Sequence, residues 1–488
     1  MFTVILLILS CAFVCLSFYY TNSNFLIIDA TEAQATQFAD TLPIDEPERG
    51  PNVINDTKLK IETVVTGLNL PTSMSFLGRN DILVLEKNNG TVKRVVNGSV
   101  MPYPLLEANV ATQGERGLLG IAITKNQNAM DAISTEASIR NDVTYVFLYY
   151  TENVTTYNGM KNVDVLLSHE GTEQVFRNRL YRYEMDYQAN QLTNPKLLLD
   201  LPADPPPINS SILSSSPGDH NGGKIDIGPD NNVYVTIGDV GGHRGLTQNE
   251  WNASTPVDGT SGILRVSQDG KPVINGPLGE TFPLNLYYAY GIRNSFGIDF
   301  DPVTGRLWDT ENGPAYADEI NLVEPGFNSG WDQVQGKWKP ILDTGMPGNE
   351  TTNPNDELVY FGESGKNGDK GRYSSPEFTW FQRPFGPTSL KFFNSDKLGE
   401  KYLNDLFVGD IHKGNIYRFE LNANRTELVF PKGPLDGKIA YFPEDPTPLV
   451  FSHGFGGVTD MQIGYEDGFL YVLSYNGNIY RIVPSHIS

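Results

Sequence analysis

The strongest constraint on the fold is a pattern that recurs six times along the chain. Each copy has an apolar run, a turn or loop, and a second apolar run that ends in Arg or an equivalent residue. Alternating, β-branched and aromatic residues mark each copy as a strand pair. Asn-Gly dipeptides such as Asn89-Gly90 and Asn476-Gly477 favour tight hairpins. The six predicted hairpins begin at Asn80, Val143, Asp230, Gly305, Leu406 and Asp467.

Hairpins repeated at intervals of roughly 60 to 90 residues predict an all-β fold, a six-bladed β-propeller with four-stranded antiparallel blades and long inter-strand loops. Leu59–Val64 is expected to close the ring by adding a strand to the last blade, which removes an exposed edge. Two stacked β-sandwiches are the alternative arrangement. Long helical periodicity is absent, and Gln127–Ile139 is at most a short loop helix.

The charge balance excludes several classes of partner. Lys and Arg number 36 and Asp and Glu 58 among 488 residues, which gives a net charge of −22. Nucleic acid and anionic membrane surfaces both need clustered cations, so neither is an expected partner. Because 39 % of the residues are hydrophobic and 11 % are aromatic, most of the chain can bury a core rather than remain disordered.

The N-terminal segment predicts export. Met1–Phe18 is almost wholly apolar and uncharged, at the border between a signal-peptide core and a membrane span. A small-residue cleavage site at Ala33-Gln34-Ala35 lies beyond this run, so residues 1–20 are either a signal peptide or an N-terminal membrane anchor. Residues 21–58 are interpreted as a flexible acidic tether, and residues 59–488 as the propeller domain. An extracellular or cell-surface location follows from either alternative.

Cysteine usage and glycosylation signals fit this compartment. Both cysteines, Cys11 and Cys15, lie in the apolar run, so the body has no disulfide framework, zinc-thiolate site or cysteine nucleophile. Asn-x-Ser/Thr sequons indicate a glycosylated surface protein, although several would arise by chance in an Asn-rich chain. The sequons are at Asn55, Asn89, Asn97, Asn153, Asn209, Asn252, Asn349 and Asn424.

The most distinctive polar run is Gly218–Lys224, which contains His220 and precedes a strand that ends in Gly238-Asp239. Glycines beside the histidine let backbone and ligand approach closely. Asp239 could orient the imidazole and stabilise its charged form, as a general base requires. The alternative is a loop histidine that only bonds the backbone.

Two further runs suggest ligand binding. Arg293-Asn294 offers forked donors for carboxylates or carbonyls, unless the arginine is only a solvated rim residue. Thr310–Glu319, which contains a Gly-Pro turn, and Gly326–Trp331 combine carboxylates with free carbonyls, the ligands that calcium prefers. No EF-hand loop is present, and an acidic surface loop is the alternative.

Together these runs resemble the soluble quinoprotein glucose/sorbosone dehydrogenase family, also called aldose sugar dehydrogenases. The similarity covers most of residues 60–484 in family order. The matching runs are GERGLLGIAI (Gly114–Ile123), DHNGGKIDIGPDNNVYVTIGD (Asp219–Asp239), YGIRNSFGIDFDPVTGRLWDTENGP (Tyr290–Pro314), DEINLVEPGFNSGW (Asp318–Trp331) and LFVGDIHKGNIYRFEL (Leu406–Leu421).

The resemblance implies binding of pyrroloquinoline quinone (PQQ) and calcium, and oxidation of the anomeric hydroxyl of an aldose sugar to a lactone. It implies that His220 takes the hydroxyl proton and that Asp239 supports it. PQQ is a tricarboxylate orthoquinone, so cations and polarising donors must surround it. The resemblance implies that Arg293 and Asn294 hold the quinone and that Lys413 faces its carboxylates. It also implies that Glu115 is a polar residue near cofactor and substrate.

For calcium, the resemblance implies two sites. The carbonyls of Gly313 and Pro314 would bind the calcium of the cofactor. Glu319 and the backbone of Ser329 would belong to a structural calcium site, where Ser329 replaces an aromatic residue of the family.

The last blade departs from the family pattern. The family has two further arginines there on PQQ, whereas this chain has Gly457 and Thr459. The loss of two charge-assisted bonds would weaken cofactor binding by about 1.5–3 kcal/mol each. Residues 340–375 are a polar loop that does not align and is expected to border the substrate entrance.

Three functions are therefore open. The first is an exported PQQ-dependent sugar dehydrogenase that passes electrons to an acceptor the sequence does not identify. The second is a non-catalytic propeller that binds a glycan or a protein, which the departures in the last blade favour. The third is a calcium-dependent lactone hydrolase, which would use a metal and a base without quinone.

Overall fold

The computed structural model describes residues 53–125, 143–157, 160–161, 172–204, 218–241, 247–250, 258–337, 373–382, 385–430 and 432–485. The apolar N-terminal run, residues 21–52 of the predicted tether, the predicted helix Gln127–Ile139 and nearly all of the polar loop 340–375 lie outside these residues. Among the described residues, no helix has the length and apolar character needed to cross a membrane.

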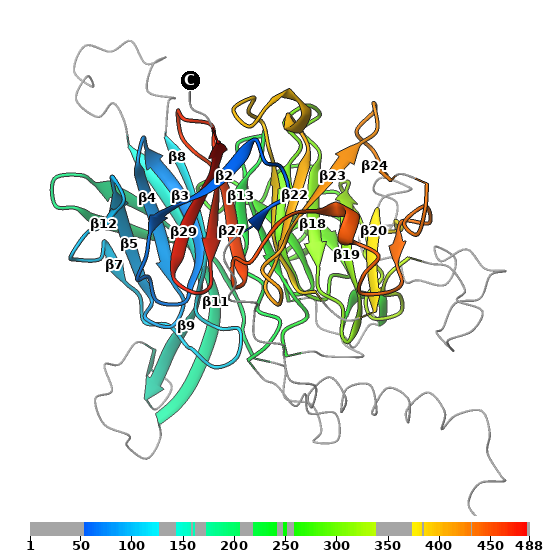
Figure 1. The fold of residues 1–488 in the computed structure, drawn as a ribbon. Helices are drawn as coiled ribbons and strands as arrows, with labels where there is room; N and C mark the ends of the chain where they lie inside the picture. The colour runs from blue at the N-terminus through cyan, green and yellow to red at the C-terminus, as the bar shows by residue number, and fades with distance from the viewer. Residues whose placement is uncertain are drawn as a thin grey trace, which may run out of the picture. The chain divides into compact units, whose positions relative to one another are not determined.

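The strands form six sheets in the described part of the chain (Figure 1). The first three contain β3 (Pro71–Gly78), β4 (Asp81–Glu86), β5 (Thr91–Val96), β6 (Ser99–Val100) and β7 (Leu106–Glu107) in blade 1; β8 (Leu118–Lys125), β9 (Thr144–Tyr157), β10 (Met160–Lys161), β11 (Thr172–Asp186) and β12 (Gln191–Pro202) in blade 2; and β13 (Ile225–Ile227), β14 (Val233–Ile237), β15 (Gly262–Val266) and β16 (Tyr287–Tyr290) in blade 3.

The other three sheets follow the same plan. They contain β17 (Ser295–Phe300), β18 (Leu307–Glu311), β19 (Tyr316–Val323), β20 (Phe378–Gln382) and β25 (Ile439–Ala440) in blade 4; β21 (Pro387–Phe392), β22 (Leu406–Asp410), β23 (Ile416–Leu421), β24 (Leu428–Val429), β26 (Val450–His453) and β1 (Val53–Ile54) in blade 5; and β27 (Val458–Ile463), β28 (Leu470–Ser474), β29 (Asn478–Pro484) and β2 (Leu59–Val65) in blade 6. Single 3₁₀ turns lie at η1 (Gln248–Glu250), η2 (Leu284–Leu286), η3 (Glu400–Tyr402) and η4 (Thr447–Leu449).

All six predicted hairpins are confirmed, and each supplies the second and third strands of a blade. The antiparallel pairs are β4–β5, β9–β11, β14–β15, β18–β19, β22–β23 and β28–β29. Turn residues and side-chain alternation specify these hairpins locally. The six-bladed propeller, and not the stacked sandwiches, is therefore the observed architecture.

The ring is closed by a strand from the other end of the chain. β2 pairs antiparallel with β29, with Ile61 opposite Ile482, so blade 6 combines residues far apart in sequence. The innermost strands β3, β8, β13, β17, β21 and β27 contact one another in turn, and β27 contacts β3. The expected role of Leu59–Val64 is thus confirmed, because this strand pairs with the edge of β29 and completes the last blade.

Each junction between neighbouring blades has its own hydrophobic cluster. Leu83 and Leu148 belong to the cluster between blades 1 and 2, and Trp308 and Phe392 to that between blades 4 and 5. The cluster at the closing junction of blades 6 and 1 includes Met74, which is fully buried. A fully buried side chain of this size contributes about 1.5–3 kcal/mol, so the ring is stabilised at all six junctions.

The N-terminal edge of the propeller begins before the predicted domain boundary. The chain divides into compact units between Ile44 and Asp45. β1 pairs with β26 of blade 5, and Asp56 forms an ion pair with Lys401 at 2.7 Å. The last six residues of the predicted tether thus lie on the propeller.

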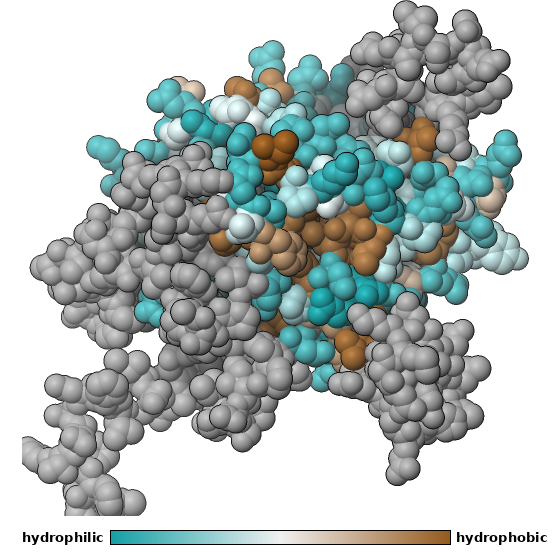
Figure 2. Space-filling model, turned by 180° about the vertical axis from the view of Figure 1, so that it is seen from behind, coloured by the Kyte–Doolittle hydropathy of each residue, from teal (hydrophilic) through white to brown (hydrophobic). Residues whose placement is uncertain are grey.

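The surface fits the acidic composition. In the view from behind, hydrophilic side chains cover most of the described surface, and hydrophobic side chains gather near its centre (Figure 2). The charge of −22 is therefore most simply that of a solvated surface.

Candidate active site

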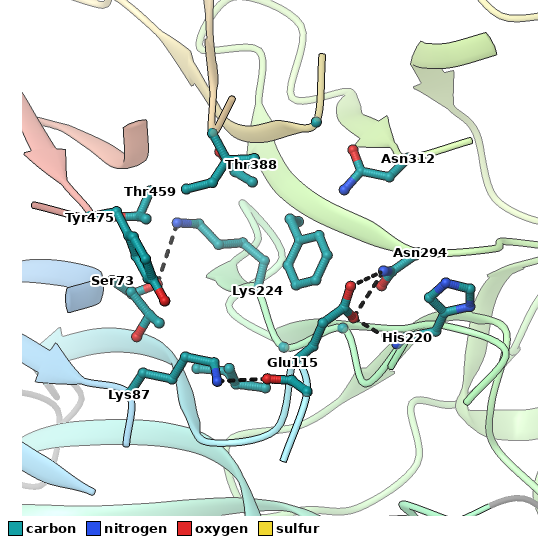
Figure 3. A pocket seen from close by; sticks show the side chains of 18 of the residues that line it. Ser73, Lys87, Glu115, His220, Lys224, Asn294, Asn312, Thr388, Thr459 and Tyr475 are labelled. Atoms are coloured by element: carbon teal, nitrogen blue, oxygen red, sulfur yellow. Dashed lines mark hydrogen bonds between the residues drawn. The ribbon is translucent and has the colours of Figure 1, made fainter. Parts of the chain in front are cut away.

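A cavity of about 450 Å³ lies where the innermost strands begin (Figure 3). Its walls are the residues that precede or open these strands and the loops that follow the second strands. This volume is in the range of small-ligand sites. All six blades contribute, and the residue types include cations, acids, amides and hydroxyls. From blade 1 to blade 6, examples are Lys87, Glu115, His220, Arg293, His412 and Thr459.

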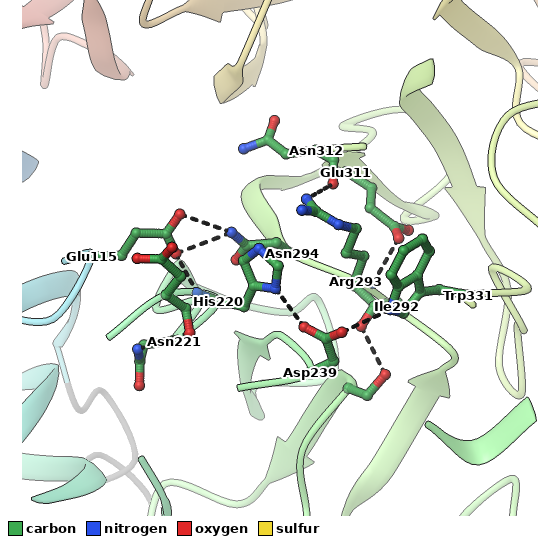
Figure 4. A network of polar contacts seen from close by, with 12 residues as sticks. Glu115, His220, Asn221, Asp239, Ile292, Arg293, Asn294, Glu311, Asn312 and Trp331 are labelled. Atoms are coloured by element: carbon green, nitrogen blue, oxygen red, sulfur yellow. Dashed lines mark hydrogen bonds and ion pairs between the residues drawn. The ribbon is translucent and has the colours of Figure 1, made fainter. Parts of the chain in front are cut away.

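The structure brings His220 and Asp239 together at this cavity (Figure 4). His220 Nδ1 lies 2.5 Å from Asp239 Oδ1, and the side chains are 10 % and 2 % exposed. His220 has a φ of 59°, in the left-handed region that non-glycine residues adopt only when the surroundings hold them there. At Gly238, a Cβ would lie 2.6 Å from the carbonyl oxygen of His220, so only glycine fits beneath the histidine.

Asp239 is held as a carboxylate. Burial acts to raise its pKa, but the charge and hydrogen bond of His220, together with Arg293 and the indole N–H of Trp331, keep the pKa below its usual value. Trp331 Nε1 donates to Asp239 Oδ2 at 2.8 Å. Because the ionised carboxylate only accepts, it favours the imidazole tautomer with the proton on Nδ1, which leaves Nε2 with a lone pair.

Glu115 connects three blades at the cavity wall. Its carboxylate accepts hydrogen bonds from the side-chain amide of Asn294 at 3.0 and 3.1 Å and from the backbone N–H of His220 at 2.6 Å (Figure 4). The structure therefore places Glu115 and Asn294, which come from separate runs of the sequence, beside the candidate base.

Arg293 also lines the cavity, and part of its donor capacity is used by the protein. Its Nη1 donates to the carbonyls of Asn312 and Gly313 at 2.8 and 2.9 Å, and its guanidinium lies 5.4 Å from the ring centre of Trp331. Burial lowers the pKa of Arg293, and surrounding carboxylates counteract this. Its backbone N–H donates to Glu311 at 2.7 Å.

Three buried polar atoms near the cavity lack a hydrogen-bond partner in the described part of the chain. They are the donor Nε of Arg293 and the acceptors Oδ1 of Asn294 and Oδ1 of Asn312. Buried polar atoms are nearly always satisfied by protein, water or ligand. The Arg293 donor and the cations around a space of this size fit a flat polar ligand with carboxylate and carbonyl groups, such as an orthoquinone cofactor, whereas the two amide oxygens need a hydroxyl or N–H donor.

The predicted calcium ligands fall in two places. Gly313 and Pro314 line the cavity, and the Gly313 carbonyl already accepts from Arg293. Glu319 is buried beside Ser329, whose hydroxyl lies 3.5 Å from its Oε2. Burial and the charge of Glu311 raise the pKa of Glu319 well above its usual value. Within the described ranges, no three His, Cys, Asp or Glu side chains could hold a metal ion together. Both calcium sites stay predictions.

Comparison with known families identifies the chain. The family model described as glucose/sorbosone dehydrogenase matches residues 68–433. The chain belongs to this family. The resemblance inferred from the sequence is thus confirmed. The match ends before the stretch that contains Gly457 and Thr459.

Relatives within the glucose/sorbosone dehydrogenase family match only part of their length. The chain is 27 % identical over 296 residues to quinoprotein glucose dehydrogenase B of Acinetobacter calcoaceticus, covering 56 % of this chain and 52 % of that protein. It is 25 % identical over 275 residues to aldose sugar dehydrogenase YliI of Escherichia coli K12, covering 55 % of this chain and 61 % of that protein. The aligned part thus spans about half to three-fifths of these relatives.

Solved structures of similar proteins share the fold. A glucose dehydrogenase from Thermus thermophilus is 25 % identical, with a TM-score of 0.57, and the similarity covers 87 % of this chain and 100 % of that chain. A PQQ-bound aldose sugar dehydrogenase from Streptomyces coelicolor is 22 % identical, with a TM-score of 0.55, and covers 88 % and 99 % of the two chains. At this identity the second comparison shows the fold alone.

The cavity differs from the family-based expectation in blades 5 and 6. Lys413 does not line the cavity; its ammonium lies 5.0 Å from the ring centre of Phe385. The neighbouring His412 lines the cavity instead. Thr459 also faces the cavity, and its hydroxyl donates to the Pro71 carbonyl at 2.9 Å, so it does not replace a cation.

Sequence reasoning missed several residues of this site. Lys224 lines the cavity and pairs with Asp460 at 2.5 Å, and Lys87 lines it from the first blade. Trp331 orients Asp239. Lys224 and Trp331 belong to sequence runs that resemble the family, and this resemblance could have marked them as candidate site residues. Lys87 had no such signal because its position depends on how blades 1 and 2 meet.

Proposed function

We propose that this member of the glucose/sorbosone dehydrogenase family is an exported PQQ-dependent oxidoreductase that acts with calcium. It oxidises the anomeric hydroxyl of an aldose sugar to a lactone and passes electrons to an external acceptor. The observation that carries the proposal is the pairing of His220 with Asp239 at the wall of a cavity to which all six blades contribute.

The residues present fit the cofactor. Arg293 Nε, which has no partner in the described residues, and the side-chain amide N–H groups of Asn294 and Asn312 would donate to the quinone oxygens. Lys87 and Lys224 line the cavity from two other blades, each close to a carboxylate of the protein. When bound, PQQ supplies the hydride acceptor for the sugar carbon. The carbonyls of Gly313 and Pro314 would supply oxygen ligands to its calcium.

His220 is the general base of the proposed reaction. Its Nδ1 is engaged by Asp239, so Nε2 accepts the proton of the sugar hydroxyl. The carboxylate of Asp239 stabilises the imidazolium that results, and Trp331 fixes that carboxylate through its second oxygen. Glu115 holds the backbone of His220 and the amide of Asn294 in place, which keeps the base aligned with the cavity.

Export is proposed from the apolar run Met1–Phe18 and from the sequons. Among sequons in the described part of the chain, the asparagines at positions 55, 89, 97 and 424 are exposed, as glycan attachment requires, whereas Asn153 is half-buried. Secretion from a eukaryotic cell line, followed by glycosidase digestion and a mobility shift, would support this. Retention inside the cell without glycans would contradict it.

The decisive experiment is a calorimetric titration of PQQ into the purified full chain with calcium, followed by reduction of an artificial acceptor dye with a panel of aldoses. Saturable binding at micromolar concentration or tighter, and sugar-dependent dye reduction, are expected. His220→Ala should abolish dye reduction and leave PQQ bound. Absence of PQQ binding by folded protein would contradict the proposal.

A second function is favoured by the last blade. Gly457 and Thr459 stand where the family has arginines, which favours a non-catalytic propeller that binds a glycan or a protein. In that case glycan binding would not depend on PQQ, and no aldose would reduce the dye. The lactone hydrolase stays a prediction, and calcium-dependent lactone hydrolysis without PQQ would support it.

A further inference from the structure

The fixed cations of the cavity are already opposed by carboxylates. Lys224 forms an ion pair with Asp460 at 2.5 Å, and both residues are buried. Lys87 and Arg293 both lie in the field of Glu115. A ligand with several carboxylates therefore meets little uncompensated positive charge on these three side chains, and it needs a further cation to bind well.

His220 is engaged by Asp239, so His412 is the remaining basic side chain among the described residues that line the cavity. It lines the cavity and is partly buried. Its ring lies against the backbone of Gly386, where an added Cβ would stand 3.0 Å from the ring atoms Cδ2 and Nε2. No hydrogen bond or ion pair of its imidazole is found within the described residues. Both ring nitrogens therefore remain for a ligand or for solvent.

The charged and titratable groups around His412 come from four elements. Asp410 and Lys413 flank it in sequence, and Asp410 accepts from the backbone N–H groups of Lys413 and Gly414. In the loop before β21, Gly386 donates its N–H to Asp318 at 2.9 Å. Tyr417 lies on β23, and Tyr475 follows β28 at the cavity wall. Asp318 is held by backbone N–H groups. Burial raises the pKa of Asp410 to about 7, and its Oδ2 has no partner in the described residues, so an Asp410 variant must separate its proton from that of the imidazole.

Burial alone accounts for the lowered pKa of His412, so the imidazole is neutral near pH 7. A carboxylate placed beside it would favour the charged form. Any ligand that binds one protonation state more tightly shifts the equilibrium toward that state. A carboxylate ligand and a proton would thus bind to this wall together.

We propose that His412, and not Lys413, faces a carboxylate of the bound cofactor, and that its imidazole takes up a proton when the cofactor binds. This inference rests on the proposed function. In this inference His412 carries a positive charge only while the cofactor is bound. That charge would take the place of the two arginines that the last blade lacks.

The test is a calorimetric titration of PQQ into the full chain with calcium at pH 7.5, in two buffers of different ionisation enthalpy. The difference between the two apparent enthalpies, divided by the difference between the ionisation enthalpies of the two buffers, gives the number of protons taken up. Wild type should take up close to one proton, and its Kd should rise up to about tenfold per pH unit between pH 7 and 9. His412→Gln should bind more weakly, without proton uptake. His412→Lys should regain affinity, independent of pH.

Three further variants complete the comparison. His453→Gln, on β26 and outside the cavity lining, is the matched control and should behave as wild type. Lys413→Gln should keep the proton uptake. Asp410→Asn should also keep it, because the proton is assigned to the imidazole. Unfolding curves establish that every variant is folded.

The outcomes separate this inference from the function on which it rests. Undiminished proton uptake in His412→Gln, or its loss in Asp410→Asn or Lys413→Gln, overturns the inference. PQQ binding without proton uptake in wild type also overturns it and leaves the dehydrogenase proposal intact. Failure of the folded wild type to bind PQQ at any pH overturns both.

Discussion

His220 Nδ1 lies 2.5 Å from Asp239 Oδ1, although 19 positions separate the two residues in sequence. His220 precedes β13 and Asp239 follows β14, and these strands form an antiparallel pair. A hairpin brings the residue before its first strand close to the residue after its second strand. The candidate base and its carboxylate are thus positioned by the same hairpin geometry that is repeated in each blade.

Asp239→Asn should lower the turnover rate by about 10² to 10⁴-fold, because the amide no longer stabilises the imidazolium and can donate to Nδ1, which favours the wrong tautomer. PQQ affinity should change little. The measurement is dye reduction at saturating sugar, with Asp230→Asn in an exposed turn as the control. An unchanged turnover rate in Asp239→Asn would remove Asp239 from the mechanism.

Trp331→Phe should distinguish the hydrogen bond that orients Asp239 from the apolar packing of the ring. The phenyl ring retains most of the apolar contact but loses the N–H that donates to Asp239. A hydrogen bond to a charged group contributes about 1.5–3 kcal/mol, so kcat should fall roughly tenfold or more while KM stays near the wild-type value. The check is steady-state kinetics with PQQ at saturation. A change confined to KM would argue against the orienting role.

Removal of the side chain of Met74 should weaken the closing junction of the ring. Met74 is fully buried between blades 6 and 1, so Met74→Ala loses its transfer free energy and leaves a cavity. The free energy of unfolding should fall by about 2–5 kcal/mol. Denaturant unfolding measures this, with Val429→Ala, which is 48 % exposed in the native protein, as a control that should change little.

The attachment of the N-terminal edge should depend on pH. The hydrogen bond from Lys401 is the largest influence on Asp56 and lowers its pKa to about 2, from an ordinary value of 3.8. A carboxyl with a depressed pKa contributes stability that is present above its unfolded pKa and is lost as the pH falls through the folded value. The stability difference between wild type and Asp56→Asn should therefore be nearly constant above pH 5, decrease as the pH falls from about 4 toward 2, and disappear only below pH 2. Thermal unfolding across this pH range is the measurement. A difference that does not decrease between pH 5 and pH 2 would contradict the assignment.

The six hairpins were predictable because alternation and turn chemistry act over a few residues. Asn89-Gly90 and Asn476-Gly477 specify their turns whatever the rest of the chain does. The pair His220–Asp239 was predictable for a related reason, since one hairpin joins it. The contacts of Trp331 and Lys87 were not, because they depend on how separate blades meet.

The sequence alone could not decide whether His412 or Lys413 faces the cavity. Both residues follow β22 in one tight turn, and one position decides which side chain faces the cavity and which lies over Phe385. Family resemblance alone could not resolve a shift of one residue in a turn, because the direction of each side chain depends on local backbone angles.

The pairing of β2 with β29 has a consequence for synthesis of the protein. Residues 59–65 leave the ribosome early, but their partner strand at residues 478–484 is among the last to be made. Until then the nascent chain is an open arc whose two end faces, including the apolar side of blade 1 that holds Met74, are exposed to water. The cavity, to which all six blades contribute, is therefore complete only after translation has almost finished. Chaperones would have to protect the exposed end faces during that interval.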